Sequence, residues 1–356
     1  MRLRLFLLPR VVALVFPVVV LTFIVLAAAL TARAEDVTVP AVDVTVLVQP
    51  GKPGIVPGGP EVNTVFPTIQ NAIDHAPVPA GGGRIIIRIT PGVYRERIWI
   101  PRNRPRVTLL GLGSDPSQTV ISAARSAPQQ GGTFFTETAE ILGDDFQADN
   151  LTCQNDAGPV GQALAISVLS DRAVFKRVRF LGWQDTLFAN WGRQYYLDCY
   201  IAGAVDFIFG NATAVFEDSE IHALGSGYLT AQSRLGPTET TGYVFIHDKL
   251  TSEKSIDPAK GVFLGRPWRP YSRVVYLDTE MDAGIRPEGW NNWGGAQNET
   301  TAFYGEYNST GPGANPAQRV PWSHLLTEQE AMPYRAANFL RGSDNWDAVA
   351  AAKALP

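Results

Sequence analysis

The sequence predicts an all-β protein that winds into a parallel β-helix, a solenoid in which each coil stacks on the previous one. A degenerate pattern of seven residues, apolar at both ends and polar in the middle, starts at residues 174, 195, 215 and 244. The starts are 21, 20 and 29 residues apart, which is close to the length of one solenoid coil. The four copies are Val174–Phe180, Tyr195–Ile201, Val215–Ile221 and Val244–Leu250.

The composition of the 356-residue chain suits short strands that are interrupted by turns. Apolar residues make up 45% of the chain, which also contains 33 Gly and 26 Pro residues. A solenoid of this length can be a single domain, because each coil packs only on its neighbours. The two Cys and four His residues show no zinc-like spacing, so we expect neither a disulfide framework nor a His-rich metal site.

Residues 1–34 have the pattern of a secretory signal peptide. Three Arg residues precede an apolar run over residues 11–30, and Ala32-Arg33-Ala34 offers a cleavage site of the A-x-A type. We therefore expect a secreted, extracellular protein, with the periplasm as an alternative destination. The run is long for a signal peptide, so retention as a signal anchor is the other alternative. After cleavage we expect no stable association with a membrane.

The net charge argues against a nucleic-acid partner. The formal net charge of the chain is −4, and cleavage after residue 34 removes four Arg and no acidic residue, which takes −4 to about −8. An acidic protein of this kind repels the phosphate backbone of nucleic acids. We expect the mature chain to act as a monomer.

The segment after the cleavage site is expected to form an arm and a cap. Residues 35–64 are rich in Val, Pro and Gly and read as an extended N-terminal arm or first strand. Pro67–Ala76 has apolar residues at positions 69, 72, 73 and 76, which predicts a short amphipathic helix with Pro67 in its first turn. Such a helix can cover the first coil of a solenoid, which has no neighbour on its outer side.

The β-helix domain is expected over residues 65–346. Its first strands are predicted at Arg84–Ile89, Arg97–Ile100, Val107–Gly111 and Thr119–Ser122. Residues 301–346 are less strand-like and are expected to pack along the outside of the solenoid, followed by a C-terminal tail over residues 347–356. Within this part, Thr327 and Glu330 have the spacing of a capping box at a helix start.

The repeat register predicts that both cysteines are free thiols. When Asn150–Cys153 is aligned with Arg177–Phe180, Cys153 stacks on Phe180, and Cys199 stacks on Val178 one coil later. The two thiols then lie two coils apart, or roughly 10 Å. This exceeds the ~7 Å that a disulfide tolerates between Cα atoms, so two buried thiols are expected.

Two carboxylates and two amides recur at the same coil spacing. Asp185 and Asp206 are 21 residues apart, and Gln162 and Gln184 are 22 apart. Residues one coil apart on one face are neighbours, because parallel strands lie roughly 4.8 Å apart. Two neighbouring carboxylates do not both ionise readily, so one can serve as an acid and the other as a nucleophile or base. Amide donors suit a developing oxyanion.

Arg266 and Trp268 add two further candidates. Arg266 could hold one carboxylate ionised through charge-assisted hydrogen bonds, and Trp268 offers a flat apolar face for a sugar ring. The structural alternatives are that the Asp residues are turn residues and that the Gln residues form a ladder along the stack. Arg266 would then form a surface ion pair, and Trp268 would contribute to packing without binding a ligand. The sequence contains no G-x-S-x-G elbow, P-loop or H-E-x-x-H motif.

At these residues the chain resembles the pectin methylesterases (pectinesterases), over a stretch from about Val65 to Trp346. The motifs that carry the resemblance are Gly92–Glu96, Gly161–Ala165, Gly182–Leu187, Val205–Ala212, Leu264–Trp268, Gly289–Trp293, Tyr304–Tyr307 and Gly311–Ala314. The resemblance implies a right-handed parallel β-helix that hydrolyses the C6 methyl esters of galacturonate units in pectin and releases methanol.

The resemblance also implies a role for each polar residue of the cluster. Asp206 would be the nucleophile, and Asp185 would be the general acid and later the base. Gln162 and Gln184 would stabilise the anionic intermediate, and Arg266 would orient Asp206. This assignment agrees with the chemistry expected from the residue types alone.

For the substrate, the resemblance implies that Trp268, Phe209 and Val205 line the subsites that hold methylated polygalacturonate. It implies no metal or organic cofactor. The alternatives from other classes are a polygalacturonase or pectate lyase, a β-helix that binds glycans without catalysis, and an esterase for a different ester. A lyase would need a Ca²⁺-binding carboxylate group and a basic proton acceptor, which the sequence does not supply in an evident arrangement.

Overall fold

The computed structural model describes residues 41–50, 64–257 and 259–355. The predicted signal peptide and most of the predicted N-terminal arm lie outside the described residues. Within the described ranges, no helix combines the length and the apolar character that crossing a membrane requires.

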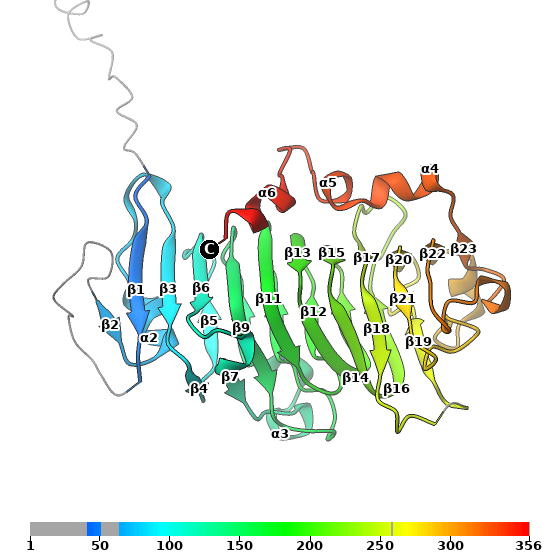
Figure 1. Ribbon diagram of the computed structural model, residues 1–356, viewed down its shortest axis with the longest axis horizontal. Coiled ribbons are helices and arrows are strands. Elements are labelled where there is room, and N and C mark those ends of the chain that lie inside the picture. The colour runs from blue at the N-terminus through cyan, green and yellow to red at the C-terminus, as the bar shows by residue number, and fades with distance from the viewer. Residues whose placement is uncertain (1–40, 51–63, 258, 356) are drawn as a thin grey trace, which may run out of the picture. The chain divides into compact units, whose positions relative to one another are not determined.

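The described residues form a right-handed parallel β-helix, as the sequence predicts (Figure 1). Three rows of parallel strands run along it, and four long strands bend from one row into another. Row 1 contains β1 (Val44–Val48), β3 (Ile85–Ile89), β6 (Val107–Gly111), β13 (Arg193–Leu197), β15 (Thr213–Glu217), β17 (Gly242–Ile246), β20 (Arg273–Leu277), β22 (Phe303–Tyr307) and β23 (His324–Leu325). β2 (Val65–Phe66) pairs with β1.

Rows 2 and 3 complete the coils. Row 2 contains β4 (Gly92–Tyr94), β7 (Thr119–Ala123), β18 (Lys249–Ser252) and β21 (Glu280–Met281). Row 3 contains β5 (Ile98–Ile100), β8 (Ala139–Ile141), β10 (Ile166–Val168), β12 (Leu187–Ala189) and β19 (Val262–Gly265). β9 (Gln147–Asn155) and β11 (Ala173–Leu181) span rows 1 and 2, whereas β14 (Tyr200–Gly210) and β16 (Glu220–Gln232) span rows 2 and 3.

Short helices lie around these rows. The α-helices are α2 (Ile69–His75), α3 (Ala127–Gln130), α4 (Glu328–Ala331), α5 (Ala336–Phe339) and α6 (Ala348–Lys353). The 3₁₀ turns are η1 (Ala80–Gly82), η2 (Pro116–Gln118), η3 (Thr133–Phe135), η4 (Ala296–Thr300), η5 (Pro316–Gln318) and η6 (Met332–Tyr334).

The predicted repeat register is confirmed. Val174 pairs with Tyr195, Tyr195 with Val215, and Val215 with Val244, so the four copies stack directly on one another. The next residue of each copy points into the core and forms a column of stacked rings with centroids 4.5–4.8 Å apart. The column consists of Phe175, Tyr196, Phe216 and Phe245 from the four copies, and it continues to Tyr276 in β20.

The polar middle of the repeat marks a stacked turn between rows 1 and 2. One residue of each coil adopts a left-handed backbone conformation there, with φ between 52° and 57°. These residues are Asn150, Arg177, Asp198, Asp218, His247, Asp278 and Asn308. Asn and Asp tolerate this conformation better than most residues do, which explains their frequency at the position. His247 occupies the same structural position in this stack of turns, with φ 55°.

The N-terminal helix covers the first coils but starts slightly later than predicted. α2 is capped by Thr68, whose side chain accepts a hydrogen bond from the Asn71 N–H, so Pro67 precedes the helix instead of lying in its first turn. The Glu96 carboxylate accepts hydrogen bonds from the N–H groups of Ile69 and Gln70 at 3.0 Å each. The apolar side of α2 is buried in the main core next to β1 and β3.

The C-terminal part corrects one expectation and confirms another. Residues 303–307 were expected to pack along the outside of the solenoid, but they form β22, which pairs with β20 and extends the solenoid by a further coil. The remainder does pack on the outside, where α4, α5 and α6 run back along the strands (Figure 1). They cover an outward row of apolar residues, Val174, Tyr195, Val215, Val244 and Val275. The predicted capping box at Thr327 and Glu330 is present.

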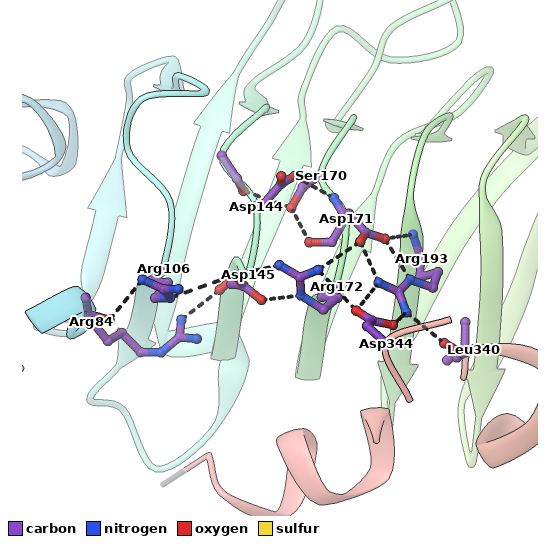
Figure 2. Close-up of polar contacts among 12 residues, drawn as sticks. Arg84, Arg106, Asp144, Asp145, Ser170, Asp171, Arg172, Arg193, Leu340 and Asp344 are labelled. Carbon is purple, nitrogen blue, oxygen red and sulfur yellow. Dashed lines mark hydrogen bonds and ion pairs between the residues drawn. The ribbon is translucent and has the colours of Figure 1, made fainter. Parts of the chain in front are cut away.

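A network of Arg and Asp side chains ties the segment between α5 and α6 to row 1 (Figure 2). Arg193 donates to Asp171 of the preceding coil at 2.6 Å and to Asp344 of this segment at 2.8 Å. Arg172 continues the network by donating to Asp145 at 2.6 Å. The prediction for the cysteines is also confirmed, because both are buried free thiols.

Candidate active site

The fold brings the two predicted amides and two predicted carboxylates to the boundary between rows 2 and 3. Gln162 bridges to Gln184, and Gln184 bridges to Val205 on the next coil, so the residues stack as the sequence predicts. Asp185 and Asp206 follow directly after Gln184 and Val205. The Asp185 N–H donates to the carbonyl of Val205 at 3.1 Å, which fixes the register of the two carboxylates.

Both carboxylates stand at unusual backbone positions. Asp185 has φ 63° in the bend before β12, and Asp206 has φ 52° where β14 bends from row 2 into row 3. The pairing of β14 with β16 is irregular between Val205 and Ile208, which is the signature of a bulge. Bulges often re-aim a side chain. The left-handed backbone therefore has a directing role at these two Asp residues, in addition to the turn role considered from sequence.

Arg266 binds Asp206 through both arms of its guanidinium. Its Nε donates to Oδ1 at 2.8 Å and its Nη2 donates to Oδ2 at 2.6 Å. The side chains are 20% and 9% exposed, so this is a largely buried ion pair. A bidentate pair of this type is stronger and more directional than a single contact. The alternative of a surface ion pair for Arg266 is excluded by its partner and its burial.

The environment separates the pKa values of the two carboxyls. Burial, together with the charge of Asp206, raises the pKa of Asp185 to about 8. Burial also raises the pKa of Asp206, but its hydrogen bonds to Arg266 and the Arg266 charge act in the opposite direction. Asp206 therefore ionises first, and Asp185 keeps its proton at neutral pH. This is the acid-and-carboxylate combination that a pair of neighbouring carboxyls can provide.

The two amides are available to a ligand. The side-chain amides of Gln162 and Gln184 are half-buried, and neither forms a hydrogen bond with another group in the described part of the chain. Amides with a purely structural role would form hydrogen bonds with one another or with the backbone along the stack. The alternative of a structural ladder is therefore less suited to these two residues than a binding role.

These groups face one cavity of about 270 Å³. It is lined by Thr133, Phe134, Gln162, Gln184, Asp185, Asp206, Phe209, Ala231, Arg266, Trp268 and Trp293. A larger hollow of about 590 Å³ lies over the stacked turns near Asp198 and His247. The smaller cavity is the better candidate because convergent polar groups and a strongly shifted pKa mark functional sites more reliably than volume.

Aromatic side chains form one wall of the cavity. Phe134 lies 4.9 Å from Phe188, Phe188 lies 4.6 Å from Phe209, and Phe209 lies 5.8 Å from Trp268, between ring centroids. Trp268 and Phe209 were predicted to bind substrate, and both line the cavity. Val205, which was also predicted, does not line it, although it directly precedes Asp206.

Sequence reasoning did not single out Phe134, Tyr228 or Trp293. Phe134 belongs to η3, outside every repeat. The rings of Tyr228 and Trp293 flank the Arg266 guanidinium at 3.8 and 3.7 Å from its carbon to the ring centroids. Trp293 ends the Gly289–Trp293 motif, so that motif was the one available signal. In the described ranges, no group of three or more His, Cys, Asp or Glu side chains is placed to hold a metal ion.

Comparisons with known proteins agree on one family. A family model described as Pectinesterase matches residues 59–343. Pectinesterase 31 from Arabidopsis thaliana is 43% identical over 275 residues, which cover 74% of this chain and 85% of the relative. The structure of a pectin methylesterase from carrot matches with a TM-score of 0.76 and 33% identity, over 84% of this chain and 93% of that chain.

A second solved structure includes a bound sugar chain. It is a pectin methylesterase in complex with hexasaccharide VII, and it matches with a TM-score of 0.70 and 30% identity. The match covers 87% of this chain and 98% of that chain.

Proposed function

Since the chain belongs to the pectinesterase family, we infer that it is a carboxylic ester hydrolase that removes methyl groups from the C6 esters of galacturonate units in pectin. The products are methanol and de-esterified pectin. The observation that best supports this inference is the pairing of an Arg-bound carboxylate, Asp206, with a neighbouring carboxyl that keeps its proton, Asp185.

Asp206 is the proposed nucleophile. One of its oxygens attacks the C6 carbonyl carbon and forms a bond to it, which gives a tetrahedral intermediate with a negative oxygen. The bidentate contact with Arg266 supports this role, because it favours the ionised carboxylate and fixes its orientation. The hydrogen bonds also restrict rotation of the carboxylate, so less ordering is needed when the ester arrives.

Asp185 is the proposed general acid and base. When the bond from C6 to the methoxy oxygen breaks, Asp185 donates its proton to that oxygen and methanol leaves. The acyl-enzyme on Asp206 is then attacked by water, whose proton returns to Asp185. Breaking the bond between C6 and Asp206 releases the acid product and restores both carboxyls.

Gln162 and Gln184 are the proposed donors to the negative oxygen of each tetrahedral intermediate. Their amides face the same cavity as the carboxylates and have no competing partner in the described chain. Removing one such donor in other enzymes costs about 10²–10³ in kcat. Trp268 and Phe209 are proposed to hold sugar rings of the polymer on either side of the ester, and the role of Val205 stays a prediction.

The location of the enzyme is proposed from its N-terminal sequence and its proposed substrate. Residues 1–34 are proposed to direct a secreted protein whose β-helix domain, residues 65–346, works as a monomer on cell-wall pectin. N-terminal sequencing of the protein recovered from the culture medium tests cleavage after Ala34. Light scattering of the purified mature chain tests the monomer.

The reaction itself is tested with highly methylated pectin. We expect methanol release at constant viscosity of the polymer solution, because an ester hydrolase leaves the sugar chain intact. A fall in viscosity that accompanies or precedes methanol would identify an enzyme that splits the chain, such as a lyase or a polygalacturonase. Binding of pectin without methanol would identify a non-catalytic β-helix.

A further inference from the structure

The Arg266 guanidinium lies between two aromatic rings. Its carbon lies 3.8 Å from the centroid of the Tyr228 ring and 3.7 Å from that of Trp293. These are short distances for a cation–π contact, which extends to about 6 Å. The edges of the same guanidinium donate both hydrogen bonds to Asp206. Its faces and its edges are therefore both occupied.

Tyr228 is held firmly by the solenoid. It belongs to β16, where it pairs with Val205 on one side and Phe263 on the other. Its ring also stacks with that of Phe263, with centroids 5.3 Å apart and planes 12° apart. Val205 immediately precedes Asp206, so the ring and the carboxylate are fixed by the same pair of strands.

Tyr228 differs from Trp293 in its access to substrate. Trp293 lines the cavity, whereas Tyr228 does not. The Tyr228 hydroxyl forms no hydrogen bond with any group that the structure describes. The contact that links Tyr228 to the site is the one between its ring and the Arg266 guanidinium.

We propose that Tyr228 is a positioning residue for ester hydrolysis, whose ring holds the Arg266 guanidinium in the plane where both of its hydrogen bonds to Asp206 form. The proposal rests on the proposed role of Asp206 as nucleophile. A guanidinium that can tilt exchanges a bidentate contact for a single one, and the carboxylate then rotates. Attack on the ester carbonyl slows, because it requires one oxygen of Asp206 at a fixed position.

Positioning of Arg266 also affects the ionisation of Asp206. The charged or titratable groups around Asp206 are Arg266, Asp185 and the buried hydroxyl of Tyr304. Of these, Arg266 alone favours the charged form of Asp206. A loosened guanidinium therefore lets burial raise the pKa of Asp206 further. The acidic limb of the profile of kcat/KM against pH should move to higher pH.

The test compares Tyr228→Leu with Tyr228→Phe in the full mature enzyme. Leu removes the ring face, whereas Phe removes only the hydroxyl. We expect Tyr228→Leu to lower kcat about tenfold with KM nearly unchanged, since cation–π contacts in dry sites have this size. The acidic limb should move up by about half a pH unit or more, and Tyr228→Phe should restore wild-type values for both quantities.

A matched control is Tyr200→Leu. Tyr200 also lies under a guanidinium, that of Arg179 at 5.4 Å, but it does not line the catalytic cavity. Its removal should leave kcat and the pH profile unchanged. Melting temperatures establish that each variant is folded, and Tyr228→Met provides a second ring-free variant with a longer, unbranched side chain if Tyr228→Leu does not fold.

Two results would overturn the proposal. One is a ring-free variant with wild-type kcat and a wild-type acidic limb. The other is a Tyr228→Phe enzyme as impaired as the ring-free one, which would place the function in the hydroxyl. A wild-type enzyme that releases no methanol from pectin would instead contradict the proposed function, so the two failures are distinguishable.

Discussion

Asp185→Asn should make the protein more stable at neutral pH while it abolishes the activity. Asp185 is 9% exposed, and burial raises its pKa from 3.8 to about 8. At pH 7 the carboxyl is protonated in the folded state and ionised in the unfolded state. Each pH unit above the unfolded pKa costs about 1.4 kcal/mol, so the site costs up to about 4 kcal/mol at pH 7.

The sign of this effect follows from the raised pKa. Because the folded-state pKa exceeds the unfolded one, the unfolded state binds fewer protons between the two values, and stability falls as pH rises. The free energy of unfolding of the wild type should therefore drop relative to that of Asp185→Asn between about pH 4 and pH 8. Above about pH 8 the difference should level off.

Urea unfolding followed by Trp fluorescence, at a series of pH values, measures this difference directly. Asp218→Asn is the matched control, because Asp218 shares the left-handed backbone with φ 53° but has a side chain that is 60% exposed. It should show no comparable divergence from the wild type. A difference between wild type and Asp185→Asn that is equal at pH 5 and pH 8 would refute the reasoning.

Three further predictions follow from the same contacts. The kcat/KM of the wild type should fall as pH rises through about 8, because Asp185 loses the proton that it is proposed to donate. A pH profile of methanol release that is flat between pH 7 and pH 9 would contradict this. Arg193→Ala removes two ion pairs, with Asp171 and with Asp344, and should lower the free energy of unfolding by roughly 1–3 kcal/mol, which urea titration measures. An unchanged unfolding midpoint would show that the two pairs contribute nothing. Cys153 and Cys199 should resist a thiol reagent in the folded enzyme and give two equivalents after denaturation without reductant; no reaction after denaturation would indicate a disulfide.

The proximity of the proposed catalytic residues could be predicted from sequence because the solenoid converts sequence spacing into spatial proximity. Gln162 and Gln184 are one coil apart, and the same holds for Asp185 and Asp206, so a coil length of about 21 residues was enough to bring them together. Sequence periodicity also predicted the repeat register, both free thiols and the capping helix at residues 69–75. Each depends on a periodic pattern that repeats along the chain.

Residues that approach from irregular segments could not be predicted in this way. Trp293 reaches Arg266 from a loop after the last row 3 strand, where the coil spacing gives no guide. Phe134 approaches from η3, between β7 and β8. Arg193 and Asp344 are 151 residues apart, and their contact depends on the path of the C-terminal helices across row 1.

β22 shows a different limit. Residues 303–307 contain Gly305 and Glu306 and have little of the apolar alternation that marks a strand. The segment is a strand because β20 offers a complete row of partners and because Tyr304 stacks on Trp290 at 4.2 Å. The aromatic residues of this segment favour a strand, but tertiary pairing was needed to form it without an alternating pattern.

The most direct measurement is the rate of methanol release from highly methylated pectin by the wild type and by Asp206→Asn. The substitution keeps the shape of the side chain and a contact with Arg266, but it removes the negative charge of the proposed nucleophile. We expect release by the wild type and a loss of at least about 10³-fold in kcat for the folded variant. Equal release by both proteins would show that Asp206 is structural and that the proposed mechanism is wrong.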